Sequence, residues 1–330
     1  MEQAIRKAVR RTAAAVLAAG AGVTAVSWRL ANVVLKPKMP DNEGLYDREV
    51  KRGRLNEQFY RSLRIERFIL MSRYGYGIAC EYLRLPEDKE KELGAEKTVN
   101  GRRKVAVLSH GFTSTKYASA MYAEIFLNRG FEVVIYDQRN HGQSGKAYTT
   151  MGYYEKFDLQ TVLDWCENRF GGDSVIVTHG ESMGAATVLN HLVIDKRPAA
   201  VIADCGYTDL GELLKYQLTR RMHLPVWPFF PVADILLRLR AGFRVREVRP
   251  ADGVKYSRVP ILFIHGAEDH FVPTRMSVQM HEMRRESTEL LIVPGAAHAV
   301  SFNTDRALYE SAVDAFLNRY VYGREEEKHE

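Results

Sequence analysis

The chain has 330 residues, of which 46% are apolar, 27% charged and 10% aromatic, and this composition excludes disorder over most of its length. The formal net charge of +6 is carried by the first 64 residues, which balance at +7, whereas the remaining 266 residues balance at −1. A nucleic-acid-binding domain gathers basic residues on its folded surface, so this distribution argues against a nucleic-acid partner and favours a basic segment beside a membrane.

An uncharged run rich in Ala and Gly, Thr12–Trp28, follows the basic residues at the N-terminus. Its 17 residues are few for a membrane span, which needs about 20. The apolar stretch Leu30–Leu35 supplies the missing length if Arg29 snorkels to the interface. We therefore expect residues 1–38 to form a single-pass anchor in the cell membrane. Its orientation is open, because Lys and Arg flank both ends.

Two other roles for this segment also fit the sequence. Basic residues followed by small residues around Ala19–Ala25 are typical of a cleaved signal peptide, which would make the protein secreted. The plainest alternative is a soluble amphipathic helix docked on the folded domain.

The region between this segment and the main domain is polar. Residues 39–64 are expected to form a connector with short helical stretches. Two apolar runs, Arg67–Ser72 and Ile78–Leu85, are separated by the turn sequence Tyr-Gly-Tyr-Gly and predict a β-hairpin. The charge-rich stretch Pro86–Lys104 is expected to be an exposed loop. The folded domain would then span residues 65–330.

From residue 105 onward, short apolar runs alternate with helical patterns. This alternation predicts an α/β fold with a mostly parallel central sheet and helices on both faces, in which ligands bind at the carboxyl ends of the strands. The expected strands are Val105–Ser109, Phe131–Tyr136, Ser174–Thr178, Ala199–Ala203, Ile261–His265 and Leu290–Val293, and the expected helices are Ala118–Arg129, Phe157–Phe170, Met183–Asp195, Thr274–Arg285 and Thr304–Tyr320.

An insertion at about residues 206–255 interrupts the alternation and is rich in aromatic residues, proline and arginine. A short helical lid with an apolar underside would exclude water and cover an acyl chain. Trp227, Phe229 and Phe230 would then contact the substrate. Packing of the insertion onto the domain explains these aromatic residues equally well.

The central chemical signal is Gly180–Gly184, with the sequence Gly-Glu-Ser-Met-Gly, which lies between an expected strand and an expected helix. A G-x-S-x-G turn in this context projects a serine hydroxyl from the sheet at a helix N-terminus. Free N–H groups and the helix dipole favour developing negative charge there. We therefore predict Ser182 as a nucleophile.

A serine hydroxyl needs a base, which should be a histidine after the last strand. His298 lies in a loop of small residues at that place, in the chain order Ser, Asp, His. Asp269, after the preceding strand, is the acid expected to orient the histidine. Glu268 beside it and Asp204 at the end of an earlier strand are competing carboxylates.

Acyl transfer also requires two N–H donors for the oxyanion. Met183, directly after the serine, is expected to supply one of them. Phe112, in the His-Gly-Phe-Thr sequence after the first strand of the alternation, is expected to supply the other. Gly111 in that sequence allows the backbone to approach closely.

These pieces together resemble the α/β-hydrolase superfamily over about residues 67–320. The matching sequences are His110–Phe112, Asp137–Ser144, Gly180–Gly184, His265–Pro273 and Gly295–His298. The resemblance implies the α/β-hydrolase fold with a short lid. Within the superfamily the chain is similar to bacterial membrane-anchored hydrolases and, more distantly, to esterase-like and lipase-like members. Glu181 departs from the His or Gln of many relatives and is expected to influence the charge preference for the substrate.

The predicted function is a serine hydrolase that cleaves carboxylic esters through an acyl-enzyme. An amidase, peptidase, thioesterase or acyltransferase would use the same residues, and a non-catalytic binding protein on this fold is the remaining alternative. The expected partners are a small ester or acyl compound and the membrane. No metal or organic cofactor is expected, because the acyl-enzyme mechanism requires none. Cys80, Cys166 and Cys205 are spaced too widely for a zinc or disulfide pattern.

Overall fold

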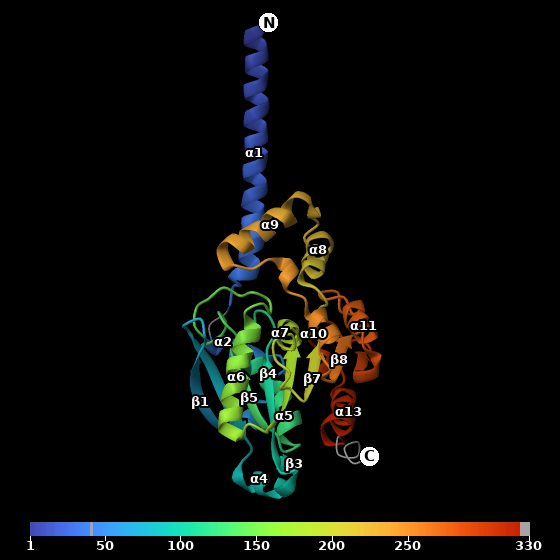
Figure 1. The fold of residues 1–330 in the computed structure, drawn as a ribbon. Coiled ribbons are helices and arrows are strands. Elements are labelled where there is room, and N and C mark those ends of the chain that lie inside the picture. The colour runs from blue at the N-terminus through green and yellow to red at the C-terminus, as the bar shows by residue number, and fades with distance from the viewer. Residues whose placement is uncertain (40–41, 324–330) are drawn as a thin grey trace.

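The computed structural model describes residues 1–39 and 42–323. Within them, one sheet has the strand order β1-β2-β5-β4-β6-β7-β8-β9, and β3 pairs with β4 outside this path (Figure 1). β2 pairs antiparallel with β1 and β5, and the neighbours from β5 to β9 pair in parallel. The strands are β1 Arg64–Met71, β2 Gly77–Arg84, β3 Thr98–Val99, β4 Arg102–Ser109, β5 Glu132–Tyr136, β6 Val175–Glu181, β7 Ala200–Asp204, β8 Ile261–Gly266 and β9 Thr288–Val293.

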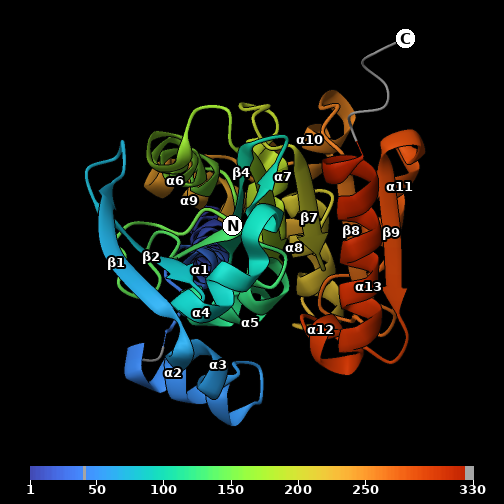
Figure 2. The same ribbon diagram turned by 90° about the horizontal axis from the view of Figure 1, so that it is seen from below.

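Helices cover both faces of the sheet, as Figure 2 shows for α6 and α10 on one side and for α5 and α12 on the other. Every residue of β5, β6, β7 and β8 is buried, as expected for parallel strands that are covered on both faces. This arrangement confirms the predicted mostly parallel sheet with helices on both faces. The covering helices are α5 Lys116–Leu127, α6 Glu155–Phe170, α7 Met183–His191, α10 Pro250–Tyr256, α11 Arg275–Glu282, α12 Ser301–Thr304 and α13 Arg306–Leu317.

The prediction of an exposed loop at Pro86–Lys104 is wrong. Helix α4, Glu87–Leu93, carries three acidic residues in its first turn, where they interact favourably with the helix dipole. The strand β3 then pairs with β4 around Asn100 and Gly101, which both have positive φ angles. Asn-Gly is the favoured two-residue hairpin turn, so the sequence contained a signal for this element.

The polar segment before the sheet lies against the domain. It forms α2, Asn42–Lys51, and α3, Glu57–Ser62. Leu55 and Tyr60 are buried in the same apolar cluster as the inner face of α5. The predicted short helical stretches are therefore present, and their side chains extend the core on that face of the sheet.

The N-terminal segment forms one continuous helix, α1, Glu2–Leu35, which passes through Arg29 without a break. It is long and apolar enough, by length and composition, to cross a membrane. Its upper part projects away from the domain, and its lower end packs against α9 (Figure 1). The residues buried at this lower end are Ser27, Ala31, Val34 and Leu35.

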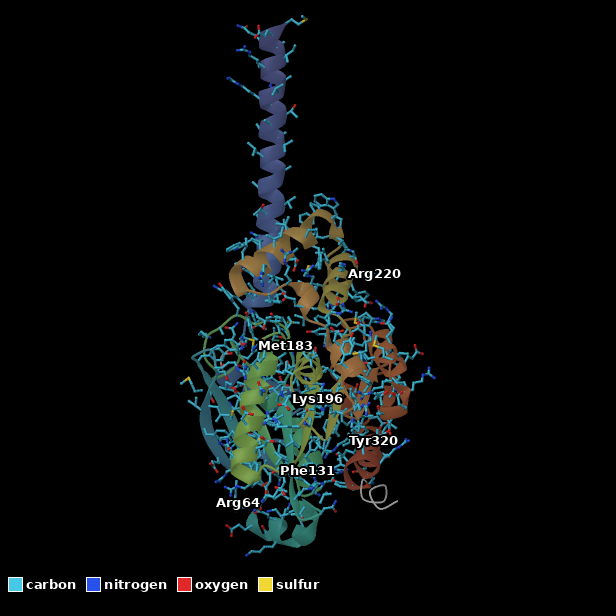
Figure 3. All side chains as sticks on the ribbon, viewed as in Figure 1. Arg64, Phe131, Met183, Lys196, Arg220 and Tyr320 are labelled. Carbon is cyan, nitrogen blue, oxygen red and sulfur yellow. The ribbon has the colours of Figure 1, made fainter. Side chains whose placement is uncertain are left out.

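The insertion consists of α8, Leu210–Arg220, α9, Val226–Ala241, and α10. Helices α8 and α9 lie beyond the sheet, beside the lower end of α1, whereas α10 returns to the sheet and packs against α7 (Figure 1). The projecting part, which we call the lid, is therefore α8 and α9 and is shorter than the predicted insertion. In Figure 3, the labelled Met183 lies in the domain below the lid, and the labelled Arg220 lies at the end of α8 in the lid.

Candidate active site

Ser182 lies in the sharp turn between β6 and α7. Its backbone has φ 54° and ψ −110°, a conformation that is strained for a residue with a side chain. The flanking glycines leave the room that this turn needs. A Cβ atom at Gly180 would lie 2.2 Å from the carbonyl oxygen of Gly184, and one at Gly184 would lie 2.1 Å from that of Ser109. The local sequence thus forces the serine side chain out at the N-terminus of α7.

The structure brings Ser182, His298 and Asp269 together from three separate loops. Ser182 Oγ lies 2.9 Å from His298 Nε2, and His298 Nδ1 lies 2.6 Å from Asp269 Oδ2. The serine is 7% exposed and the carboxylate is buried. With the Nδ1 proton donated to Asp269, Nε2 is free to accept a proton from the serine hydroxyl.

Asp269 is held by four donors. Its Oδ1 accepts hydrogen bonds from the backbone N–H groups of Phe271 and Val272, at 2.8 and 2.9 Å. Its Oδ2 accepts from His265 Nε2 at 3.1 Å as well as from His298. Burial alone would raise the pKa of Asp269, but the hydrogen bonds from His265 and His298 outweigh it and hold the pKa well below its usual range. The carboxylate is therefore an anion near neutral pH.

His265 is a residue that the sequence did not assign to the site. Its Nδ1 accepts from Ser277 Oγ at 2.7 Å, which leaves the Nε2 proton for Asp269 and for the carbonyl oxygen of Val272. The only signal in the sequence is its place four residues before Asp269, at the end of the strand. That spacing does not show that the two side chains meet.

The two competing carboxylates lie elsewhere. Glu268 is exposed. Asp204 is buried, and Tyr122 donates to its Oδ2 at 3.4 Å. Burial and the nearby Glu181 carboxylate raise the pKa of Asp204 to about 8, so this group is a neutral acid near pH 7.

Glu181 is buried beside the nucleophile and is already paired. Its Oε2 accepts from Arg54 Nη2 at 2.6 Å and from the Tyr122 hydroxyl at 2.8 Å. The Glu181 charge is also the largest of the influences that raise the pKa of Arg54. Arg54 compensates the Glu181 charge inside the protein, and an influence of Glu181 on the charge preference for the substrate stays a prediction. The sequence offered no signal for this pair, which joins the polar segment before the sheet to the turn at Ser182.

The loop after β4 lies against the nucleophile. A Cβ atom at Gly111 would lie 3.5 Å from Ser182 Cβ. His110 fixes this loop, because its Nδ1 donates to the carbonyl of Gly111 at 2.7 Å and its Nε2 accepts from Gln138 N at 2.9 Å. Burial lowers the pKa of His110 to about 3, so the ring is neutral. Phe112 follows Gly111 in this loop, Met183 directly follows the serine, and both pack in one apolar cluster.

The structure separates the three lid aromatics that were expected to contact the substrate. Trp227 is 74% exposed. The carbonyl of Phe229 accepts a hydrogen bond from Ser27 of α1 at 3.1 Å. Only Phe230 packs against the apolar cluster that contains Met183.

One group among the described residues has the composition of a metal site. Ligand atoms of Cys205, Asp269 and His298 lie within 4.8 Å of one another. Two of these residues already hydrogen bond to each other, and burial raises the pKa of the Cys205 thiol well above its usual value. The hydrogen bonds explain this arrangement, and the absence of a metal cofactor stays a prediction.

Comparison with known proteins agrees with the fold. The family described as "Serine aminopeptidase, S33" matches residues 100–219. The uncharacterized protein YqkD of Bacillus subtilis is 34% identical over 307 residues, which cover 92% of this chain and 96% of YqkD. The lysophosphatidylserine lipase ABHD12 of Xenopus tropicalis is 21% identical over 201 residues, 59% of this chain and 50% of the lipase. The Pyrococcus furiosus esterase Pf2001 superposes with a TM-score of 0.61 at 23% identity, over 78% of this chain and 92% of the esterase. The chain is therefore a hydrolase of the α/β-hydrolase superfamily, in the same family as YqkD.

Proposed function

We propose that this hydrolase cleaves carboxylic esters with Ser182 as its nucleophile. The observation that carries the proposal is the unbroken chain of hydrogen bonds from Ser182 Oγ through His298 to Asp269. This is the geometry in which an imidazole takes the proton of an attacking hydroxyl. The esterase and lipase among the similar proteins support the same chemistry.

Acylation begins when Ser182 Oγ attacks the ester carbonyl carbon and its proton moves to His298 Nε2. The carbonyl oxygen becomes an oxyanion, and the N–H groups of Phe112 and Met183 donate to it. Collapse of this intermediate breaks the bond to the alkoxy oxygen, which leaves as an alcohol with the proton from His298. The acyl group is then bound to Ser182 as an ester.

Deacylation repeats these steps with water as the nucleophile. Water gives a proton to His298 Nε2 and adds to the acyl carbon. Collapse then breaks the bond to Ser182 Oγ, which takes the proton back, and the carboxylic acid leaves. Asp269 stabilises the imidazolium in both halves of the cycle.

A peptidase is the second candidate, because the matching family is described as a serine aminopeptidase. An aminopeptidase must bind the protonated amine of its substrate, for which a free carboxylate near the nucleophile is the suitable partner. Glu181, the carboxylate next to Ser182 in the chain, is engaged by Arg54. This pairing favours an ester over a peptide with a free N-terminus.

We further propose that α1 anchors the enzyme in the cell membrane as a single-pass helix. Its length, its apolar composition and the exposure of its upper part support this role. Resistance of the full chain to alkaline carbonate extraction is the expected result. Recovery of a shorter, soluble chain that begins within residues 19–27 would instead support a cleaved signal peptide.

Labelling with a fluorophosphonate probe, together with hydrolysis of p-nitrophenyl esters, tests the catalytic proposal. Ser182→Ala should abolish labelling and lower kcat/KM by at least about 10³-fold. The exposed Ser62, changed to Ala, is the matched control and should keep both activities. Labelling or hydrolysis that survives in Ser182→Ala would overturn the mechanism. A panel of aminoacyl p-nitroanilides tests the peptidase alternative.

A further inference from the structure

A hollow lies between the lower end of α1 and the two lid helices. Its cavity volume is about 60 Å³, which is several times the roughly 10–15 Å³ that one water molecule needs. Residues from both α1 and the lid line it, so neither element forms it alone. The lining includes Leu30 and Val34 of α1, Leu214 of α8, and Phe230, Ala233 and Leu237 of α9.

The surface of this hollow is almost entirely apolar. Its two polar lining residues are Gln217 and Asp234. The amide of Gln217 donates to the carbonyl of Phe271, and Asp234 accepts from the backbone N–H of Val245 at 2.8 Å. Both side chains thus have partners in the protein. A hollow of this kind favours an aliphatic occupant over water.

The hollow lies at the level where the membrane would end. Trp28 is 46% exposed, and the guanidinium of Arg240 on α9 lies 4.1 Å from its ring centroid. Trp and Arg side chains are typical of the headgroup layer. The lining residues of α1 begin at Leu30 and so follow Trp28 within about two helical turns, at 1.5 Å per residue. An occupant of the hollow could therefore come directly from the bilayer.

The hollow also borders the proposed active site. Val34, Leu237 and Phe230 belong to the apolar cluster that contains Met183 and Phe112. Helix α8 contacts the loop that carries Asp269, because the Tyr216 hydroxyl donates to the carbonyl of His270 at 3.3 Å. The same cluster thus extends from the hollow to Met183, the residue after Ser182.

We propose that the hollow binds one aliphatic chain of a membrane-borne ester while the ester group of the same molecule reaches Ser182. This inference rests on the proposed esterase activity and narrows its substrates to amphiphilic esters with long acyl chains. The membrane helix then has a second role as one wall of the chain-binding site. Apolar contact with α1 and α9 supplies the preference for long chains.

The test uses the full chain in phosphatidylcholine vesicles and two kinds of readout. The first is the ratio of kcat/KM for p-nitrophenyl palmitate to that for p-nitrophenyl butyrate. The second is photolabelling of the Ser182→Ala chain by palmitic acid with a diazirine in its chain, in competition with unlabelled palmitic acid. Ala233→Phe fills the hollow from α9, and Leu214→Trp fills it from α8. Leu239→Phe is the matched control, because Leu239 is exposed and lies outside the lining residues.

We expect both filling variants to lower the palmitate-to-butyrate ratio at least tenfold and to remove the competable labelling of peptides from α1, α8 and α9. Leu239→Phe should leave the ratio and the labelling unchanged. A ratio and a labelling pattern that are the same in the filling variants as in the original chain would overturn the inference. If the original chain hydrolyses neither ester, the proposed function fails, and the labelling of Ser182→Ala alone decides whether the hollow binds a chain. Unchanged thermal unfolding of the filling variants shows that they fold.

Discussion

Two buried carboxylates lie one strand apart at the same edge of the sheet and differ in charge. Burial and the nearby Glu181 raise the pKa of Asp204, at the end of β7, to about 8. Burial acts in the same direction on Asp269, after β8, but hydrogen bonds from His265 and His298 hold its pKa well below the usual range. The charges and hydrogen bonds around each carboxylate, together with its burial, thus decide which of the two is an anion. Only a carboxylate that is an anion, as Asp269 is, can stabilise the imidazolium of His298.

The largest expected effect is a loss of kcat that occurs when Asp269 is changed but not when Asp204 is changed. Asp269→Asn should lower kcat by about 10⁴-fold, because the amide cannot stabilise the protonated imidazole and favours the wrong tautomer. Asp204→Asn should lower kcat by less than about tenfold, since the amide resembles the neutral acid already present. Steady-state kinetics on one ester measures both. Equal losses in the two variants would contradict the assignment of the acid.

The next largest effect is expected at Arg54, whose guanidinium pairs with the buried Glu181. Arg54→Met leaves Glu181 buried without its charge partner, which should cost about 3–5 kcal/mol in the free energy of unfolding. Arg52→Met, at an exposed position nearby, is the control and should change it by less than about 0.5 kcal/mol. Denaturant unfolding in detergent measures both values. A stable Arg54→Met protein would mean that Glu181 takes up a proton or reaches water.

The pH dependence of stability provides an effect that is smaller per pH unit and has a defined sign. Because the pKa of Asp204 is raised from 3.8 to about 8, the folded chain holds a proton there that the unfolded chain releases. Its contribution to stability is complete below pH 4 and is lost as pH rises towards 8, by at most about 1.4 kcal/mol per pH unit. The difference in unfolding free energy between the original chain and Asp204→Asn should therefore fall over this range. A flat difference would show that Asp204 is already ionised.

The smallest effect is expected at the neighbour of the proposed acid. Glu268 is exposed, so solvent screens its charge from His298. Glu268→Gln should change kcat/KM by less than about twofold, within the small range that exposed charges contribute. The same kinetic assay measures it. A loss comparable to that of Asp269→Asn would show that the wrong carboxylate has been assigned.

Features with local signals could be predicted from the sequence. The strand–turn–helix pattern around Gly180–Gly184 predicted the position of Ser182, because the turn requires glycine where a Cβ at Gly180 would collide with the backbone of Gly184. The alternation of strands and helices likewise predicted the sheet. The hairpin between β3 and β4 had the same kind of signal at Asn100 and Gly101, which the charged composition of the region obscured.

Features that depend on contacts between distant residues could not be predicted. Arg54 and Glu181 are separated by 127 positions, and nothing in either local sequence indicates the pair. Asp204 and Asp269 both follow strands, and only their hydrogen-bond partners distinguish them. Trp227 is exposed whereas Phe230 packs against an apolar cluster, and composition does not determine this difference.

The packing of α1 on the lid determines where the chain can be shortened for work in water. A chain that begins at residue 27 loses the exposed upper helix and keeps Ala31 and Val34 against α9. A chain that begins at residue 39 also loses the carbonyl of Leu35, which accepts a hydrogen bond from Thr149 N at 3.1 Å, and leaves the apolar side of the lid uncovered. A chain that begins at residue 65 removes Arg54 as well. A shortened form for work in water should therefore keep the last two turns of α1.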